Sequence, residues 1–112
     1  MTLGELTELQ KKFDSNHKGK FTWDTKVTDS NIEMLEFLLV SLTGELGEAA
    51  NIVKKVVRGD FKLEEKKTDL QEEIVDIFIY LLKMSYQLDI DLEAVYIDKM
   101  KKNQERFHKY EK

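Results

Sequence analysis

The stretch 33–57, EMLEFLLVSLTGELGEAANIVKKVV, decides the fold because its apolar residues recur at alternating spacings of three and four. This period is typical of an α-helix with one face buried against another element. The residues of this buried seam are Leu35, Leu38, Leu42, Ala49, Ile52 and Val56. The position that the pattern assigns between Leu42 and Ala49 is Glu45, so a carboxylate interrupts an otherwise apolar face.

A second helical stretch near residues 68–87 repeats this arrangement. Its seam consists of Leu70, Ile77, Tyr80 and Met84. Glu73 occupies the position between Leu70 and Ile77. Each seam glutamate also has an acid three residues later, Glu48 and Asp76, and such residues are neighbours on a helix surface. Two antiparallel helices would therefore bring four carboxylates into one cleft.

Four carboxylates in one cleft require a cation. Burying an unpaired carboxylate is very costly, and like charges raise each other's pKa. Hard divalent cations relieve both costs, since they prefer oxygen ligands. We therefore expect a magnesium site, with manganese as the alternative metal, whose ligands and catalytic groups are Glu45, Glu48, Glu73 and Asp76. The competing interpretation is a solvated acidic face, which is the usual place for any single acid.

The remaining sequence predicts two further helices and no other domain. Thr2 and Glu5 have the spacing of a capping box, which predicts a helix over residues 2–13, and residues 14–30 read as a loop. Ser30 and Glu33 repeat that spacing before the long helix, which ends near Val57. Residues 60–67 are expected to form a charged connection, with the third helix starting near Thr68. Asp91 is expected to cap a last helix that reaches Phe107. The sequence thus predicts one all-α domain over residues 1–112, a four-helix bundle.

Composition restricts the classes of function. The chain has 112 residues and no cysteine, which excludes disulfides and thiolate metal sites. Its net charge of −4 argues against binding a nucleic-acid polymer. No apolar run approaches the roughly 20 residues needed to span a bilayer, so we expect a cytoplasmic protein without a membrane partner. Because so short a chain buries surface inefficiently, we expect self-association.

Two segments resemble a known family. TGELGEAAN (43–51) followed by EEIVD (72–76) is similar to the E-x-x-E, spacer, E-x-x-D signature of MazG-like nucleotide pyrophosphohydrolases. DKMKKNQERF (98–107) resembles the closing lysine, asparagine and arginine element of that family. The resemblance covers roughly residues 23–107. Gly44 departs from the pattern, because many relatives carry a further glutamate there.

The resemblance implies hydrolysis of a nucleoside triphosphate between the α and β phosphates, giving a monophosphate and pyrophosphate. It also implies a homodimer or a homotetramer made from two dimers. Several short relatives act on deoxypyrimidine triphosphates or modified nucleotides and so sanitise the nucleotide pool. Glu72, beside the four acids, is a further candidate for orienting or deprotonating the attacking water.

Five residues are candidates for binding the substrate. Lys99, Lys102, Asn103 and Arg106 recur at helical spacing and could bind phosphate, although such a face is also common on solvated helix ends. Trp23 in the polar loop could stack on a base, although a lone tryptophan is more often a packing anchor.

Three other functions compete with this interpretation. A di-iron carboxylate bundle needs Glu-x-x-His motifs among its core acids, and the two histidines of the chain, His17 and His108, lie in the wrong places for such a site. A phosphoribosyl-ATP pyrophosphohydrolase would use related helices and acids on a different substrate. A non-enzymatic helical interaction module would use the acids to bind a basic partner, without any linkage to magnesium.

Overall fold

The computed structural model describes residues 1–20 and 22–112, and Phe21, in the predicted loop, lies outside the described residues. The described residues are helical apart from loops and an isolated antiparallel bridge between Lys18 and Thr22. This agrees with the all-α prediction. The elements are α1 (Leu3–Ser15), η1 (Asp29–Asn31), α2 (Glu33–Arg58), α3 (Leu63–Gln87), α4 (Leu92–Arg106) and η2 (His108–Tyr110).

Helix α1 starts as the sequence predicts and ends two residues later than expected. The backbone N–H of Glu5 donates to the Thr2 hydroxyl at 3.1 Å, and that of Thr2 donates to the Glu5 carboxylate at 3.2 Å. This capping box satisfies two N–H groups that have no partner within the helix. The additional residues at the end are Asp14 and Ser15.

The start of α2 differs from the prediction, whereas its end agrees. Ser30 does not cap the helix; instead Thr28 and Asn31 cap the short turn η1, where the N–H of Thr28 donates to Asn31 Oδ1 at 2.6 Å. The helix ends at Arg58 and is capped by Gly59, whose φ of 93° lies in the left-handed region that glycine adopts without steric cost.

Helix α3 starts five residues before the predicted Thr68, so the charged connection expected over residues 60–67 is wrong. Leu63–Gln87 is continuous helix, and the N–H of Lys62 donates to the Glu65 carboxylate at 3.3 Å. The physical reason is that glutamate and lysine are good helix formers. Helix α4 starts at the predicted cap, because Asp91 accepts from the N–H of Ala94 at 3.1 Å, and it ends at Arg106.

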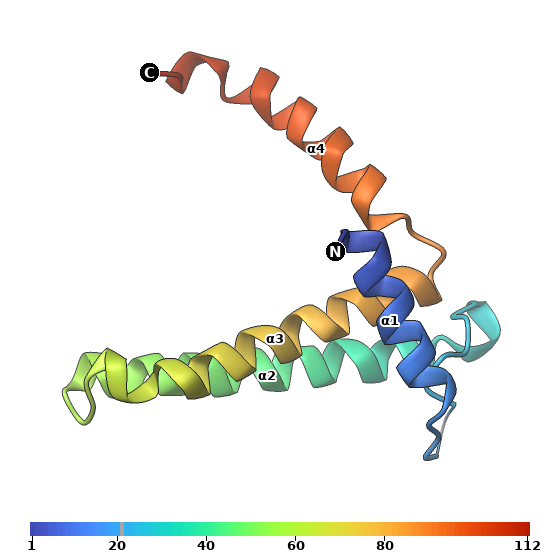
Figure 1. Ribbon diagram of the computed structural model, residues 1–112, viewed down its shortest axis with the longest axis horizontal. Helices are drawn as coiled ribbons and strands as arrows, with labels where there is room; N and C mark the ends of the chain where they lie inside the picture. Colours follow the sequence, from blue (N-terminus) through green and yellow to red (C-terminus); the bar gives the residue numbers. More distant parts are fainter. Residues whose placement is uncertain (21) are drawn as a thin grey trace.

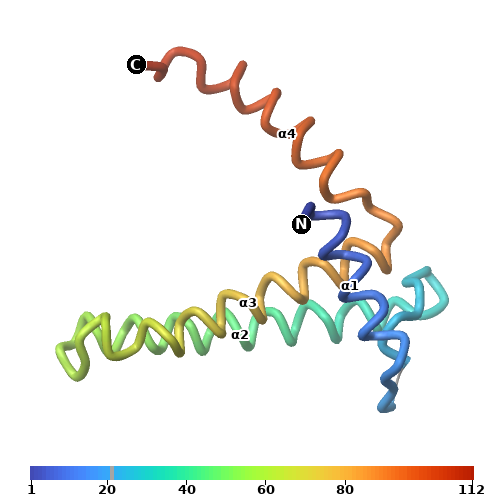
Figure 2. Tube along the Cα trace, in the orientation of Figure 1, coloured from blue at the N-terminus to red at the C-terminus, as the bar shows by residue number. Residues whose placement is uncertain are grey.

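Helices α2 and α3 run side by side as a long antiparallel hairpin, and α1 crosses the end of that hairpin away from its tight turn (Figure 1). Helix α4 leaves this end and extends away from the hairpin, as the trace in Figure 2 shows. Within one chain the four helices therefore do not close into a bundle. The expected four-helix bundle is a three-helix arrangement with a projecting fourth helix.

The chain is open for its size. Its radius of gyration is 17.3 Å, whereas a compact domain of this length has a value of about 13 Å. Among the described residues, only two apolar side chains are buried, Leu38 and Leu82, at 6% and 3% exposure.

None of the helices in the described part of the chain has an apolar stretch that could cross a membrane.

Candidate functional site

The hairpin places the predicted acids opposite one another. Glu45 lies in the middle of α2, and Glu73 and Asp76 lie in the middle of α3. The tight turn that begins at Gly59 reverses the chain, so positions equally far from it lie side by side. Oxygen atoms of Glu45, Glu73 and Asp76 all lie within 4.8 Å of one another.

Glu45 and Glu73 have an electrostatic environment that a cation would relieve. Both side chains are half-buried, and the Oε2 atom of each is buried without a hydrogen-bond partner. The hydrogen bond to Glu45, burial and the charge of nearby Glu48 raise the pKa of Glu73 from 4.5 to about 7. Buried polar atoms are rarely left without a hydrogen-bond partner. The unpaired Oε2 atoms of Glu45 and Glu73 therefore indicate a place for a cation.

Glu48 has a more peripheral position than the other acids. It is exposed and is not among the three residues whose oxygens converge. Its hydrogen bond to Glu73 nevertheless contributes to the raised pKa, so the four predicted acids form one electrostatic unit. Glycines 44 and 47 leave α2 open beside this unit, because a Cβ built on either would meet nothing within 4 Å.

Comparison with known proteins gives the family. Residues 34–110 match the model of the MazG nucleotide pyrophosphohydrolase domain. The chain belongs to the MazG family. It is also similar to the Gene 37 protein of Mycobacterium phage L5, with 37% identity over 78 residues, which are 68% of each chain. No solved structure matches the chain significantly. The all-helical structure is consistent with membership of the MazG family.

A pocket of about 550 Å³ in this MazG chain has Tyr80 in its lining, one turn of α3 beyond Asp76, and none of the four acids lines it. Its lining residues come from the loop, α2 and α3 and include Trp23, Phe37, Leu38, Tyr80, Lys83 and Gln87. Its volume is within the usual range for small-molecule sites. His17 stacks on Trp23 with ring centroids 5.1 Å apart, so Trp23 is part of an aromatic wall.

The basic residues of the closing element lie elsewhere. Lys99, Lys102, Asn103 and Arg106 are all on α4, which extends away from the hairpin (Figures 1 and 2). Lys102 pairs with Asp98 at 3.3 Å, and the Arg106 guanidinium lies 5.0 Å from the ring centroid of Phe107. One chain therefore does not bring these residues to the carboxylates.

Sequence reasoning missed a polar cluster beside the pocket. Asp14 is completely buried and interacts with Lys83 and Tyr86 of α3. Gln87 is buried and donates from Nε2 to the carbonyl of Trp23 at 2.8 Å. One signal was available, since Lys83 interrupts the apolar run IFIYLLKMSY (77–86). Asp14 gave none, because it lies just beyond the predicted end of the first helix.

Proposed function

We propose that this chain hydrolyses nucleoside triphosphates between the α and β phosphates, giving a nucleoside monophosphate and pyrophosphate. The observation that carries the proposal is the convergence of Glu45, Glu73 and Asp76, with two buried carboxylate oxygens that lack partners. The nucleotide pyrophosphohydrolase activity in the name of the matched family supports the class of reaction.

Magnesium fits this donor set. The cluster offers carboxylate oxygens, the ligands that magnesium and manganese prefer. Glu45, Glu73 and Asp76 would hold the metal, with Glu48 at the edge of the site. When bound, magnesium neutralises phosphate charge and activates water. The reaction consumes one water, whose oxygen bonds to the α-phosphorus as the bond to the α–β bridging oxygen breaks and pyrophosphate leaves.

The chain's own residues would orient the substrate. The carboxylates would hold the metal beside the reacting phosphates, and one of them, or Glu72, would accept the proton of the attacking water. The pocket lined by Trp23 and Tyr80 accepts the base at one end of the cluster. We assign a preference for deoxypyrimidine nucleotides, and a role in sanitising the nucleotide pool, on the resemblance to short members of the family.

Self-association is part of the proposal, because the isolated chain exposes too much surface. Its accessible surface is 8796 Å², whereas a folded monomer of 13.2 kDa has about 6,400 Å². The excess, about 2,400 Å² per chain, is larger than the roughly 800 Å² that each partner buries in a standard interface. An excess of this size is typical of an obligate dimer or a larger assembly.

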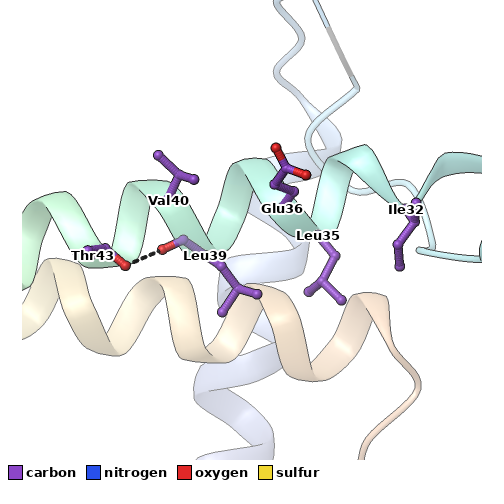
Figure 3. Close-up of a pocket in the computed structure, with 6 residues that line it drawn as sticks. All are labelled: Ile32, Leu35, Glu36, Leu39, Val40 and Thr43. Carbon is purple, nitrogen blue, oxygen red and sulfur yellow. Dashed lines mark hydrogen bonds between the residues drawn. The ribbon is translucent and has the colours of Figure 1, made fainter.

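The exposed apolar face of α2 is where a second copy would pack. Ile32, Leu35, Leu39 and Val40 line a shallow pocket on this helix, together with Glu36 and Thr43. Figure 3 shows Leu35 and Leu39 on the side of α3 and Val40 pointing away from it. Val40 is 65% exposed within one chain. A second copy covering this face would also supply an α4, so Lys99, Lys102, Asn103 and Arg106 would reach the phosphates of the partner's site.

The direct test is the release of pyrophosphate from a panel of canonical and modified dNTPs and phosphoribosyl-ATP, with magnesium, with manganese and with EDTA. We expect metal-dependent formation of equal amounts of monophosphate and pyrophosphate. Glu45→Gln and Asp76→Asn should abolish it, whereas Glu64→Gln, on the exposed surface of α3, should retain it. Release of inorganic phosphate instead, or no turnover with any nucleotide, would contradict the proposal.

A further inference from the structure

Asp14 of α1 is a completely buried carboxylate with three side-chain partners. It accepts from Gln10 Nε2 at 2.9 Å and from the Tyr86 hydroxyl at 2.5 Å. Its third partner is the ammonium of Lys83, with 3.3 Å between Nζ and Oδ1. Asp14 therefore fixes two side chains of α3 from a different helix.

Lys83 extends from this ion pair into the wall of the pocket. Its side chain is 13% exposed, and its Nζ atom lies 4.7 Å from the ring centroid of Trp23 and 5.8 Å from that of Tyr80. A buried ion pair is a poor way to gain stability, because an apolar pair of similar volume is often as stable or more so. The pair has a clearer use as a fixed charged donor at the edge of a binding pocket.

The position of Lys83 along α3 suits a contact with the base of a nucleotide. Asp76, Tyr80 and Lys83 are spaced by four and three residues and so share one face of the helix. At 1.5 Å per residue, Lys83 is about 10 Å along the axis from Asp76. A nucleotide whose phosphates lie at the acids would extend past Tyr80 and place the edge of its base near the ammonium.

We propose that Lys83, held in place by Asp14, is a specificity-determining residue that donates a hydrogen bond to the O4 atom of a pyrimidine base. This inference rests on the proposed function. An ammonium has three donors and no acceptor, so it can bond to the O4 of uracil or thymine but not to the 4-amino group of cytosine. The pocket therefore prefers dUTP and dTTP to dCTP.

The experiment compares dUTP with dCTP in two measurements on the full chain. The first is kcat/KM with magnesium, and the second is the equilibrium affinity for the α,β-imido analogues, which are not hydrolysed. Lys83→Met removes the donor while keeping the length of the side chain. Because it also removes the cation that neutralises the buried Asp14, the double variant Asp14→Asn with Lys83→Met provides a neutral pair, and Lys83→Arg keeps both the donor and the ion pair.

We expect the wild-type protein and Lys83→Arg to prefer the dUTP analogue by about 10- to 100-fold, the value of one hydrogen bond from a charged group. The preference should fall to about threefold or less in both Lys83→Met and the double variant, mainly through weaker binding of the dUTP analogue. An unchanged preference in a folded double variant, or a wild-type preference for dCTP, would overturn the inference while leaving pyrophosphate release intact. Selective binding without turnover would instead contradict the proposed function and support the role of Lys83.

Discussion

Glu45 of α2 and Glu73 of α3 face each other across the hairpin, and each leaves its Oε2 atom buried without a hydrogen-bond partner. Both belong to the group of acids whose oxygens lie within 4.8 Å of one another. The side-chain hydrogen bond with Glu45, burial and the repulsion from the charges of Glu48 and Glu45 raise the pKa of Glu73. A proton or a divalent cation would relieve that repulsion, and this relationship leads to the first two predictions.

Replacing Glu73 by glutamine should stabilise the metal-free protein and abolish its response to metal. Glutamine removes one charge and keeps the volume, so the Tm in EDTA should rise. A ligand that binds only the folded state raises the Tm, so magnesium should stabilise the wild type but not Glu73→Gln. Differential scanning fluorimetry measures both effects. Activity should fall by at least about 100-fold, since mutating residues that only support the metal ligands already lowers metal affinity or activity by about 10- to 100-fold. A magnesium shift retained in Glu73→Gln would contradict the assigned site.

The stability of the metal-free protein should decrease as the pH rises from about 4.5 to 7. Across that window the folded state, with Glu73 at a pKa of about 7 rather than 4.5, binds more protons than the unfolded state. Stability therefore falls with rising pH. The change should be smaller in Glu73→Gln, measured by urea unfolding at several pH values in EDTA. Because protons and magnesium compete for the same oxygens, the magnesium shift of the wild type should be larger at pH 8 than at pH 6.

A charge on the exposed apolar face of α2 should dissociate the assembly. Val40 is 65% exposed in one chain and points away from α3 (Figure 3). Val40→Lys should shift the protein toward monomers in sedimentation velocity experiments and make its Tm lower and more dependent on concentration. Val40→Leu, which keeps the site apolar, should remain assembled. If Val40→Lys sediments like the wild type, this face is not the interface.

Sharing of one site between two copies can be tested by complementation. Glu73→Gln and Arg106→Ala should each be inactive or strongly impaired alone, because one lacks a carboxylate and the other a phosphate donor. Mixed dimers would contain one site with both changes and one with neither. Co-expression with two different tags should therefore recover up to about half of the wild-type activity in the doubly purified fraction. If verified mixed dimers recover no activity, Arg106 either acts with the carboxylates of its own chain or is not part of an active site.

Removing the hydroxyl of Tyr86 should destabilise the contact between α1 and α3. Its hydrogen bond to the buried Asp14 is 2.5 Å long, and burial together with this bond raises the pKa of Tyr86, keeping the phenol protonated as a donor. Tyr86→Phe leaves one oxygen of a buried carboxylate with fewer partners and should cost about 1–3 kcal/mol. Urea unfolding of this variant should show that loss, and the exposed Tyr110→Phe should show almost none.

Local sequence patterns determined most of the helices and the acids that face each other. The capping box at Thr2, the stop at Gly59 and the cap at Asp91 depend on neighbours in the chain, so they could be predicted. The convergence of Glu45, Glu73 and Asp76 also followed from sequence, because helical period and an antiparallel hairpin fix which positions meet.

Contacts between distant segments decided the rest. The prediction that α3 starts near Thr68 was wrong, because strong helix formers extend the helix back to Leu63, where the preceding turn permits it. The burial of Asp14 beside Lys83 and Tyr86 depends on how α1 crosses α3, which periodicity within either helix does not specify. The separation of the basic residues on α4 from the acids likewise depends on the angle at which α4 leaves the hairpin (Figure 1). Period and caps act over a few residues of one chain, whereas crossing angles are set by the side chains that meet between helices.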